Sequence, residues 1–251
     1  PQGHPRPQDP VAETPAPRGL AAVAPPVEAG RKEPPNARLL DGGDTIQGSA
    51  LASVYEIGRR EGRTRAPEPM MLAMNALGYT AAVIGNHEFD WTVDTLARRV
   101  HEMRFAALGA NMLQVKNGKR PAWVRADTIV TRRGVRIGIL GLCYPLTPTV
   151  TLAKNVTAYK FVDDSTTAAG LVPGLRKQGR ADVVVGIGHI PGNADSTGKA
   201  TGDLGRLARG VPGVDVWFGG HSHNRVNGRA GEIPALIAGA LGEVVGVCDL
   251  R

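Results

Sequence analysis

Short apolar runs that end in glycine recur along the chain, with amphipathic segments between them, and this alternation limits the folds open to it. Five runs share this character: ARLLDGGD, TAAVIGN, FAALGAN, ADVVVGIGH and VDVWFGGH. Continuous apolar runs of this length are typical of strands buried on both faces. Four segments between them place apolar residues three and four apart: PEPMMLAMNALGY, TVDTLARRVHEM, TAAGLVPGLRKQG and TGDLGRLARG. They predict helices that cover a sheet, and therefore an α/β fold.

Two further stretches refine this prediction. WVRADTIVTRRGVRIGILGL predicts two strands joined by a turn at RRG, so part of the sheet is a hairpin. Residues 1–36 are rich in proline and alanine, which favours irregular chain. Pro25 and Pro26 interrupt the helical pattern of GLAAVAPPVEAGRK, because each removes a hydrogen-bond donor. We predict an irregular segment over residues 1–36 and one folded domain over residues 37–251.

Size and composition exclude several classes of protein. The 251 residues, 42% of them hydrophobic, are enough for one large core. No apolar run reaches the roughly 18 residues needed to cross a bilayer, so no membrane span is expected. The net charge is +7, but Lys and Arg are scattered and only 4% of residues are aromatic, so nucleic acid is not an expected partner. Cys143 and Cys248 lie in apolar stretches, where a thiol behaves as a small buried hydrophobe.

Polar residues follow the predicted strands at their C-terminal ends. They are Asp44, Asn86, His87, His189, His221 and His223. In layered α/β folds this edge carries the site, because the strands are rigid and the loops beyond them vary freely. Separate structural roles are also open at this stage: Asp44 as a helix N-cap, Asn86 as a turn residue and His189 as a hydrogen-bonded core histidine.

The combination of these residues favours a metal centre. A carboxylate, an amide oxygen and three imidazoles form a mixed O/N ligand set. That set suits Mn, Zn, Fe or Co, whereas Ca²⁺ prefers oxygen ligands alone. His221 and His223 stand two positions apart on a predicted turn, where two imidazoles can share one site.

Taken in order, these motifs resemble the bacterial 5′-nucleotidase family of calcineurin-like metallophosphatases. The resemblance covers about residues 37–250 and rests on five stretches: LLDGGDTIQGS, AMNALGYTAAVIGNHEFDW, GVRIGILGLCYP, ADVVVGIGH and VPGVDVWFGGHSH. It implies a four-layer α/β/β/α sandwich with two divalent metal ions, of the kinds Mn, Zn, Fe, Co or Mg, at the strand ends.

The resemblance also implies which residues bind the two metals. Asp44 would bridge them, and His223 would bind the first metal. Asn86, His189 and His221 would complete the site of the second metal. Both sites would then lie at one edge of the sheets.

His87 and Asp90 resemble the catalytic dyad of the family. The imidazole would approach the phosphate, and the carboxylate would orient the ring and support its positive charge. The implied reaction is the hydrolysis of nucleotide phosphomonoesters, or of another phosphate ester, by a hydroxide that the two metals activate.

The chain departs from the family pattern at both ends. Family members open with a strand that ends in Asp-x-His-Gly and supplies two further ligands, whereas this chain begins PQGH. Family members also carry a second domain that grips the nucleobase, and this chain stops at Arg251. We therefore expect the first strand and the C-terminal nucleotide-binding domain to be absent, which leaves Asp44 and His223 to hold the first metal.

Two other functions stay open on the sequence alone. A 2′,3′-cyclic-nucleotide phosphodiesterase would use the same residues on the same scaffold. A degenerate, non-catalytic module that binds phosphate or metal is favoured by the missing Asp-x-His motif and disfavoured by the intact pair of His87 and Asp90. By resemblance, the protein is expected in the periplasm, at the cell surface or secreted.

Overall fold

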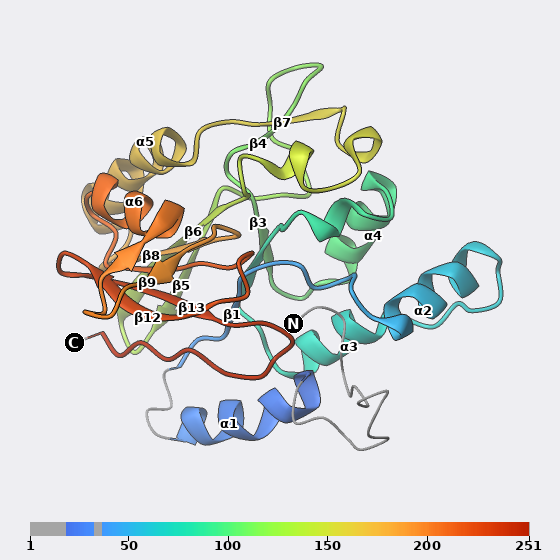
Figure 1. The fold of residues 1–251 in the computed structure, drawn as a ribbon, viewed down its shortest axis with the longest axis horizontal. Coiled ribbons are helices and arrows are strands. Elements are labelled where there is room, and N and C mark those ends of the chain that lie inside the picture. The colour runs from blue at the N-terminus through green and yellow to red at the C-terminus, as the bar shows by residue number, and fades with distance from the viewer. Residues whose placement is uncertain (1–18, 33–36, 251) are drawn as a thin grey trace.

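The predicted strands divide between two facing sheets (Figure 1). The computed structural model describes residues 19–32 and 37–250. In these ranges, one sheet is parallel and has the order β1-β2-β3: β1 (Leu40–Asp41), β2 (Ala81–Val83) and β3 (Ala106–Leu108). The other contains β5 (Asp127–Arg132), β6 (Val135–Leu142), β8 (Val183–Gly188), β11 (Val216–Phe218), β12 (Arg225–Ala230) and β13 (Ile233–Ala238). Its order is β12-β13-β11-β8-β6-β5, with the inner strands parallel and the two edge strands antiparallel to their neighbours.

Helices cover the outer face of each sheet (Figure 1). The three-stranded sheet is covered by α3 (Pro69–Ala76) and α4 (Val93–Glu102), and α1 (Leu20–Lys32) packs its first residue, Leu20, against α3. The six-stranded sheet is covered by α5 (Asp164–Arg176) and α6 (Gly202–Gly210). The remaining helix, α2 (Ala50–Arg60), projects from the body of the molecule beyond α3 (Figure 1).

Neighbouring residues of a strand face different layers, as the pleat requires. In β6, Ile139 packs in the apolar cluster between the two sheets, whereas Leu140 packs in the cluster under α5 and α6. Val185 and Val184 of β8 repeat this division. The layers therefore run helix, sheet, sheet, helix, which confirms the predicted four-layer α/β/β/α sandwich.

The sequence pattern located most of these elements. The predicted runs form β1, β2, β3, β8 and β11, and the predicted amphipathic segments form α3 to α6. The predicted hairpin is β5–β6, where Arg132 pairs with Val135 across the turn. Helix α2 and the β12–β13 hairpin were not predicted.

The prediction that residues 1–36 are irregular is wrong for residues 20–32, which form α1 with both prolines inside it. Three apolar residues three and four apart are buried, namely Leu20, Val23 and Val27, while Pro25 and Pro26 are exposed. Burial of that apolar face outweighs the backbone hydrogen bonds that the prolines remove. Residues 1–18 and 33–36 of the predicted segment lie outside the described residues.

Short elements complete the described chain. β4 (Met112–Gln114) pairs with β7 (Tyr159–Phe161), and β9 (Asn193–Ala194) pairs with β10 (Ala200–Thr201). Single 3₁₀ turns form η1 (His87–Phe89), η2 (Thr147–Thr149), η3 (Ala153–Asn155) and η4 (Lys177–Gly179). Among the described residues, no helix is long and apolar enough to cross a membrane.

Candidate metal centre

Four of the predicted ligands meet where parallel strands of both sheets end. Asp44 and Asn86 follow β1 and β2 of the first sheet. His189 and His221 follow β8 and β11 of the second sheet. His189 Nε2 lies at the middle of the group, 3.0 Å from Asp44 Oδ2, 3.0 Å from Asn86 Oδ1 and 3.2 Å from His221 Nδ1. The fold thus brings Asp44, His189 and His221 within reach of one ion, with Asn86 Oδ1 beside them.

The protonation of His189 shows that this cluster suits a cation. His189 Nδ1 lies 2.7 Å from Gly42 O, and because a carbonyl oxygen only accepts, Nδ1 carries a proton. In the neutral ring, Nε2 is then a lone pair that faces two further acceptors, Asp44 Oδ2 and Asn86 Oδ1. Acceptors that converge in this way need a proton or a metal ion between them. Their mixed O/N character is the one expected for Mn, Zn, Fe or Co.

The orientation of the Asn86 amide agrees with a ligand role. Asn86 is 1% exposed, and its Nδ2 donates to Val150 O at 3.0 Å. This hydrogen bond turns Oδ1 toward His189, so the atom that can bind a metal points into the cluster.

Three of the predicted ligands have left-handed backbone conformations. The φ angles are 60° at Asp44, 63° at His221 and 57° at His223. Within the described residues, Arg133 and Leu241 are the other non-glycine residues with positive φ. Such conformations cost of order 1 kcal/mol or more each and gather at functional sites, where the surrounding structure holds them. Their concentration here therefore supports a functional role for this edge.

Glu88 organises the loop that carries Asp44. It is 1% exposed, and its carboxylate accepts from the backbone N–H groups of Asp44 (2.8 Å), Gly85 (2.7 Å) and Thr45 and from Thr45 Oγ1 (3.0 Å). Burial and the charge of Asp44 raise the pKa of Glu88, and the backbone hydrogen bonds oppose that shift. A Cβ at Gly85 would lie 2.3 Å from Asp44 Oδ1, so this close approach requires glycine.

The electrostatics of the cluster keep Asp44 ionised and His221 neutral. Burial tends to raise the pKa of Asp44, but the hydrogen bond and charge of His189 lower it to about 2. Burial and the nearby His189 lower the pKa of His221 to about 4. Burial also tends to lower the pKa of His189, yet the hydrogen bond and charge of Asp44 outweigh it and raise that pKa. A cation would therefore bind an ionised Asp44 and a neutral His221 directly, but it would have to displace a proton from His189.

His87 and Asp90 form the predicted dyad beside this cluster. His87 Nδ1 lies 2.6 Å from Asp90 Oδ2, and the backbone N–H of His87 donates to Asp44 Oδ1 at 2.9 Å. The hydrogen bond with Asp90 raises the pKa of His87 to about 9, with help from the charge of Asp44 and against the effect of burial. The His87 side chain is 43% exposed. The His87 ring is therefore positively charged at neutral pH, and a ligand can reach it from the solvent.

His223 stands apart from the close cluster that Asp44, His189 and His221 form among the described residues. It is exposed, but it lines the same cavity as those three residues, with a volume of about 630 Å³ that extends between β1 and the six-stranded sheet. Binding of a further metal by His223 stays a prediction.

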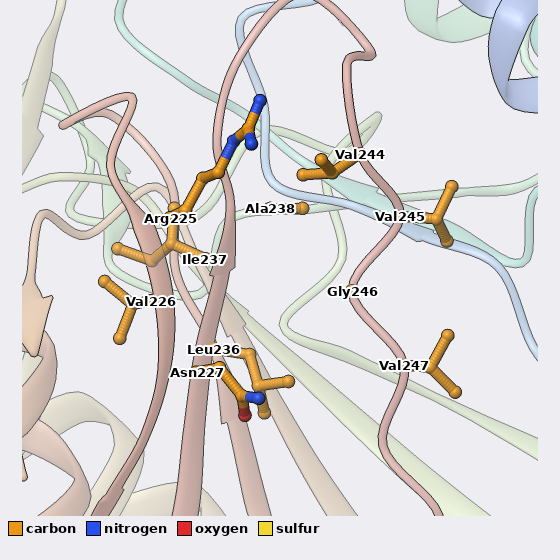
Figure 2. Close-up of a pocket in the computed structure, with 10 residues that line it drawn as sticks. All are labelled: Arg225, Val226, Asn227, Leu236, Ile237, Ala238, Val244, Val245, Gly246 and Val247. Atoms are coloured by element: carbon orange, nitrogen blue, oxygen red, sulfur yellow. The ribbon is translucent and has the colours of Figure 1, made fainter. Parts of the chain in front are cut away.

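A smaller cavity of about 230 Å³ lies between the β12–β13 hairpin and residues 244–247 (Figure 2). Figure 2 shows Val244, Val245 and Val247 on one side and Arg225, Val226 and Ile237 on the other. Its lining includes none of the predicted site residues, so this cavity is separate from the candidate metal centre.

Local sequence predicts no role for Glu88 or for residues 150–155, which contact both Asn86 and Asp90. Glu88 had a detectable signal, because a carboxylate inside the apolar stretch AAVIGNHEF needs partners once it is buried. Residues 150–155 had none, since their contacts depend on how the loop folds back.

Comparison with known proteins agrees with this geometry. Residues 16–225 match the family described as calcineurin-like phosphoesterase, and the chain therefore belongs to that family. It is 34% identical over 254 residues to a 2′,3′-cyclic-nucleotide 2′-phosphodiesterase/3′-nucleotidase from Yersinia enterocolitica. That match covers 92% of this chain and 38% of the relative, so the chain spans about two fifths of the relative's length.

Solved structures share the fold. The calcineurin-like phosphoesterase YfkN from Bacillus subtilis matches with a TM-score of 0.78 at 24% identity, over 90% of this chain and 75% of that chain. A 5′-nucleotidase precursor from Thermus thermophilus matches with a TM-score of 0.71 at 25% identity, over 91% of this chain and 44% of that chain. The four layers seen here are therefore those of known phosphoesterase structures.

Proposed function

We propose that residues 37–251 form the catalytic domain of a metal-dependent phosphoesterase that hydrolyses nucleotide phosphomonoesters. The observation that carries this proposal is the set of ligand atoms around His189 Nε2 with the protonated His87 beside it. A module that only binds phosphate or metal needs the cluster but has no need of an imidazolium fixed by Asp90. Similarity to proteins named for nucleotide hydrolysis supports nucleotides as the substrate class.

In this proposal Asp44, Asn86, His189 and His221 would hold one divalent cation, and Asp44 with His223 would hold a second. Divalent cations bound at such a site lower the pKa of water and neutralise the charge of the phosphoryl oxygens. The protein preorganises the ligand Asp44, because a hydrogen bond to Glu88 fixes the backbone at that residue.

His87 supplies a proton to the leaving oxygen of the substrate. Its Nδ1 is engaged by Asp90, so the proton on Nε2 is the one available for transfer. Asp90 keeps the ring oriented and stabilises its positive charge. General acid catalysis of this kind contributes roughly 10²–10⁴-fold to the rate.

A second candidate is the hydrolysis of 2′,3′-cyclic nucleotides by the same residues. The observation in its favour is the 34% identity to a relative that is named for this activity. Both reactions add water across a P–O bond, so both would use the same metal ligands and the same acid.

Rates measured side by side distinguish these candidates. The chain loaded with Mn²⁺ is assayed with 5′-AMP, 3′-AMP and 2′,3′-cyclic AMP, with His87→Ala as the control. Phosphate release from 5′-AMP that falls at least about 10²-fold in the control variant supports the main proposal. Faster turnover of the cyclic nucleotide selects the second candidate. Metal binding without hydrolysis of any of the three substrates contradicts both and leaves a non-catalytic module.

We also infer from the resemblance to bacterial 5′-nucleotidases that the protein acts in the periplasm, at the cell surface or in the medium. Fractionation of the cells that produce it tests this inference. Recovery of the protein with a cytoplasmic marker would contradict it.

A further inference from the structure

The loop after β6 contacts the metal cluster and the dyad at three points. Val150 O accepts from Asn86 Nδ2. Thr151 Oγ1 donates to Asp90 Oδ1 at 2.9 Å. Asn155 Nδ2 donates to the backbone carbonyls of Phe89 (2.7 Å) and Asp90 (3.1 Å). A single segment, residues 150–155, therefore meets a predicted ligand and both the side chain and the backbone of the dyad carboxylate.

We propose that Thr151 is a positioning residue that orients His87 through Asp90. This inference rests on the proposed function, because the dyad matters only if the site hydrolyses phosphate esters. The two oxygens of Asp90 have different partners: Oδ2 faces His87 Nδ1, and Oδ1 accepts from Thr151. A carboxylate with one partner can turn about its Cβ–Cγ bond, where the torsional preference is broad. The second partner fixes its plane, and with it the direction of the imidazole.

Asn155 supports the same carboxylate from the backbone side. η1 is a single turn, so its last carbonyls have no partner within the helix. Asn155 Nδ2 donates to two of them, at Phe89 and Asp90. The backbone of Asp90 is thus held in place, and the Thr151 hydroxyl selects how its side chain is turned.

Thr149 offers a matched control in the same loop. Its Oγ1 donates to Leu146 O at 2.8 Å, which is a contact inside the loop and not with the dyad. Thr149→Val removes the same kind of hydroxyl only two positions before Thr151. Effects that come only from a looser loop should therefore appear in both variants.

Steady-state kinetics of the Mn²⁺-loaded chain on 2′,3′-cyclic AMP and 5′-AMP give the first test. Thr151→Val should lower kcat about three- to tenfold, the usual effect of losing one such hydrogen bond, with KM changed less than about twofold. Thr151→Ser keeps the hydroxyl and should retain at least half of the parental kcat, as should Thr149→Val. An unchanged kcat in Thr151→Val, or an equal loss in Thr149→Val, would overturn the proposal.

A double-mutant cycle tests whether Thr151 acts through Asp90. If it does, adding Thr151→Val to Asp90→Ala should cause no further loss of kcat, because the contact is already gone. A further loss as large as in the parent background would show that Thr151 acts by another route and would overturn the proposal.

Proton NMR of the Zn²⁺-loaded chain gives a test that does not depend on activity. The Nδ1 proton of His87, assigned by its loss in His87→Gln, should exchange slowly with water in the parent and in Thr149→Val. It should exchange at least about threefold faster in Thr151→Val, because the carboxylate that shields it is free to turn. Equal exchange in all three proteins would overturn the positioning role. Failure of the proposed function would instead appear as no hydrolysis by the parent, with this NMR difference still decisive for Thr151.

Discussion

The two sheets hold their halves of the metal cluster in different ways. The three-stranded sheet supplies the predicted oxygen ligands Asp44 and Asn86, and both are fixed by contacts from outside their own loops, namely Glu88 and Val150 O. The six-stranded sheet supplies the imidazoles. His189 directly follows β8 and donates to Gly42 O, while His221 packs against Tyr144 with ring centroids 4.7 Å apart and the rings tilted by 38°.

This difference predicts that substitutions in the two halves affect the stability of the chain and its affinity for metal differently. The oxygen half depends on a buried carboxylate with several backbone donors, so damage there should reduce both the stability of the chain and its affinity for metal. The imidazole half follows strands that the core already fixes, and the contact of His189 with Gly42 O is a single hydrogen bond, so substitutions there should reduce mainly the affinity for metal.

The largest effect is expected when one ligand is removed from each half. The double variant Asn86→Ala, His189→Ala should bind Mn²⁺ at least about 10³-fold more weakly, since even the groups that only support metal ligands are worth 10–100-fold each. Isothermal titration calorimetry measures the change, with His101→Ala on the exposed face of α4 as the control. Affinity equal to that of the parent would show that the ligand assignment is wrong.

The next largest effect tests the oxygen half alone. Glu88→Gln places an amide NH₂ or a single carbonyl where the carboxylate accepts from Asp44, Thr45 and Gly85. Buried donors left without an acceptor cost about 1–3 kcal/mol each, so the free energy of unfolding should fall by about 3 kcal/mol in the metal-free chain. Urea denaturation measures this change. Glu61→Gln, whose side chain is 56% exposed, should change stability by less than about 0.5 kcal/mol. Similar values for the two variants would remove the distinction between the halves.

The sequence predicted that these four residues would lie together because they all follow strands that alternate with helices, while their role as ligands stays a prediction. Parallel strands end at a common edge, so Asp44, Asn86, His189 and His221 had to approach one another once the sheets formed. Local sequence could not predict what holds them. Glu88 and Thr151 act through partners more than 40 positions away, and such contacts depend on how the loops fold back across the strand ends.

The helices also show that local sequence cannot predict elements that depend on long-range contacts. α2 begins at the N-cap Ser49, whose hydroxyl accepts from the N–H of Ala52, and a cap of this kind is readable from sequence. α1 contains Pro25 and Pro26, and local propensity argued against it. Its helical form depends on the burial of Leu20 with Met70, Met71 and Met74 of α3, which is tertiary information.

A third prediction separates the dyad from both halves of the cluster. His87→Ala should lower kcat about 10²-fold or more, and Asp90→Asn should lower it less, because orienting the ring is an indirect task. Neither variant should change the metal content measured by elemental analysis, since neither side chain is assigned as a ligand. Loss of metal in His87→Ala would place that imidazole among the ligands instead.

The smallest expected effect is the pH dependence of the affinity for metal, which tests the imidazole half. Cations bind neutral imidazole, and the pKa of His189 is raised by Asp44, so a proton competes with the metal. Affinity for Mn²⁺ should be constant above the pKa of His189 and fall about tenfold per pH unit below it. His221 should add to this loss only near pH 4, where its lowered pKa lies. Titrations between pH 5 and pH 9 measure the slope, and a flat profile would exclude His189 as a ligand.

The most direct test of the central claim, that both sheets bind one cation together, is an anomalous difference map from crystals grown with Mn²⁺. We expect a peak about 2.0–2.3 Å from Asp44 Oδ2, Asn86 Oδ1, His189 Nε2 and His221 Nδ1, the distances usual for oxygen and nitrogen ligands. A map without a peak at this point, or with the ion bound by the residues of one sheet alone, would contradict it.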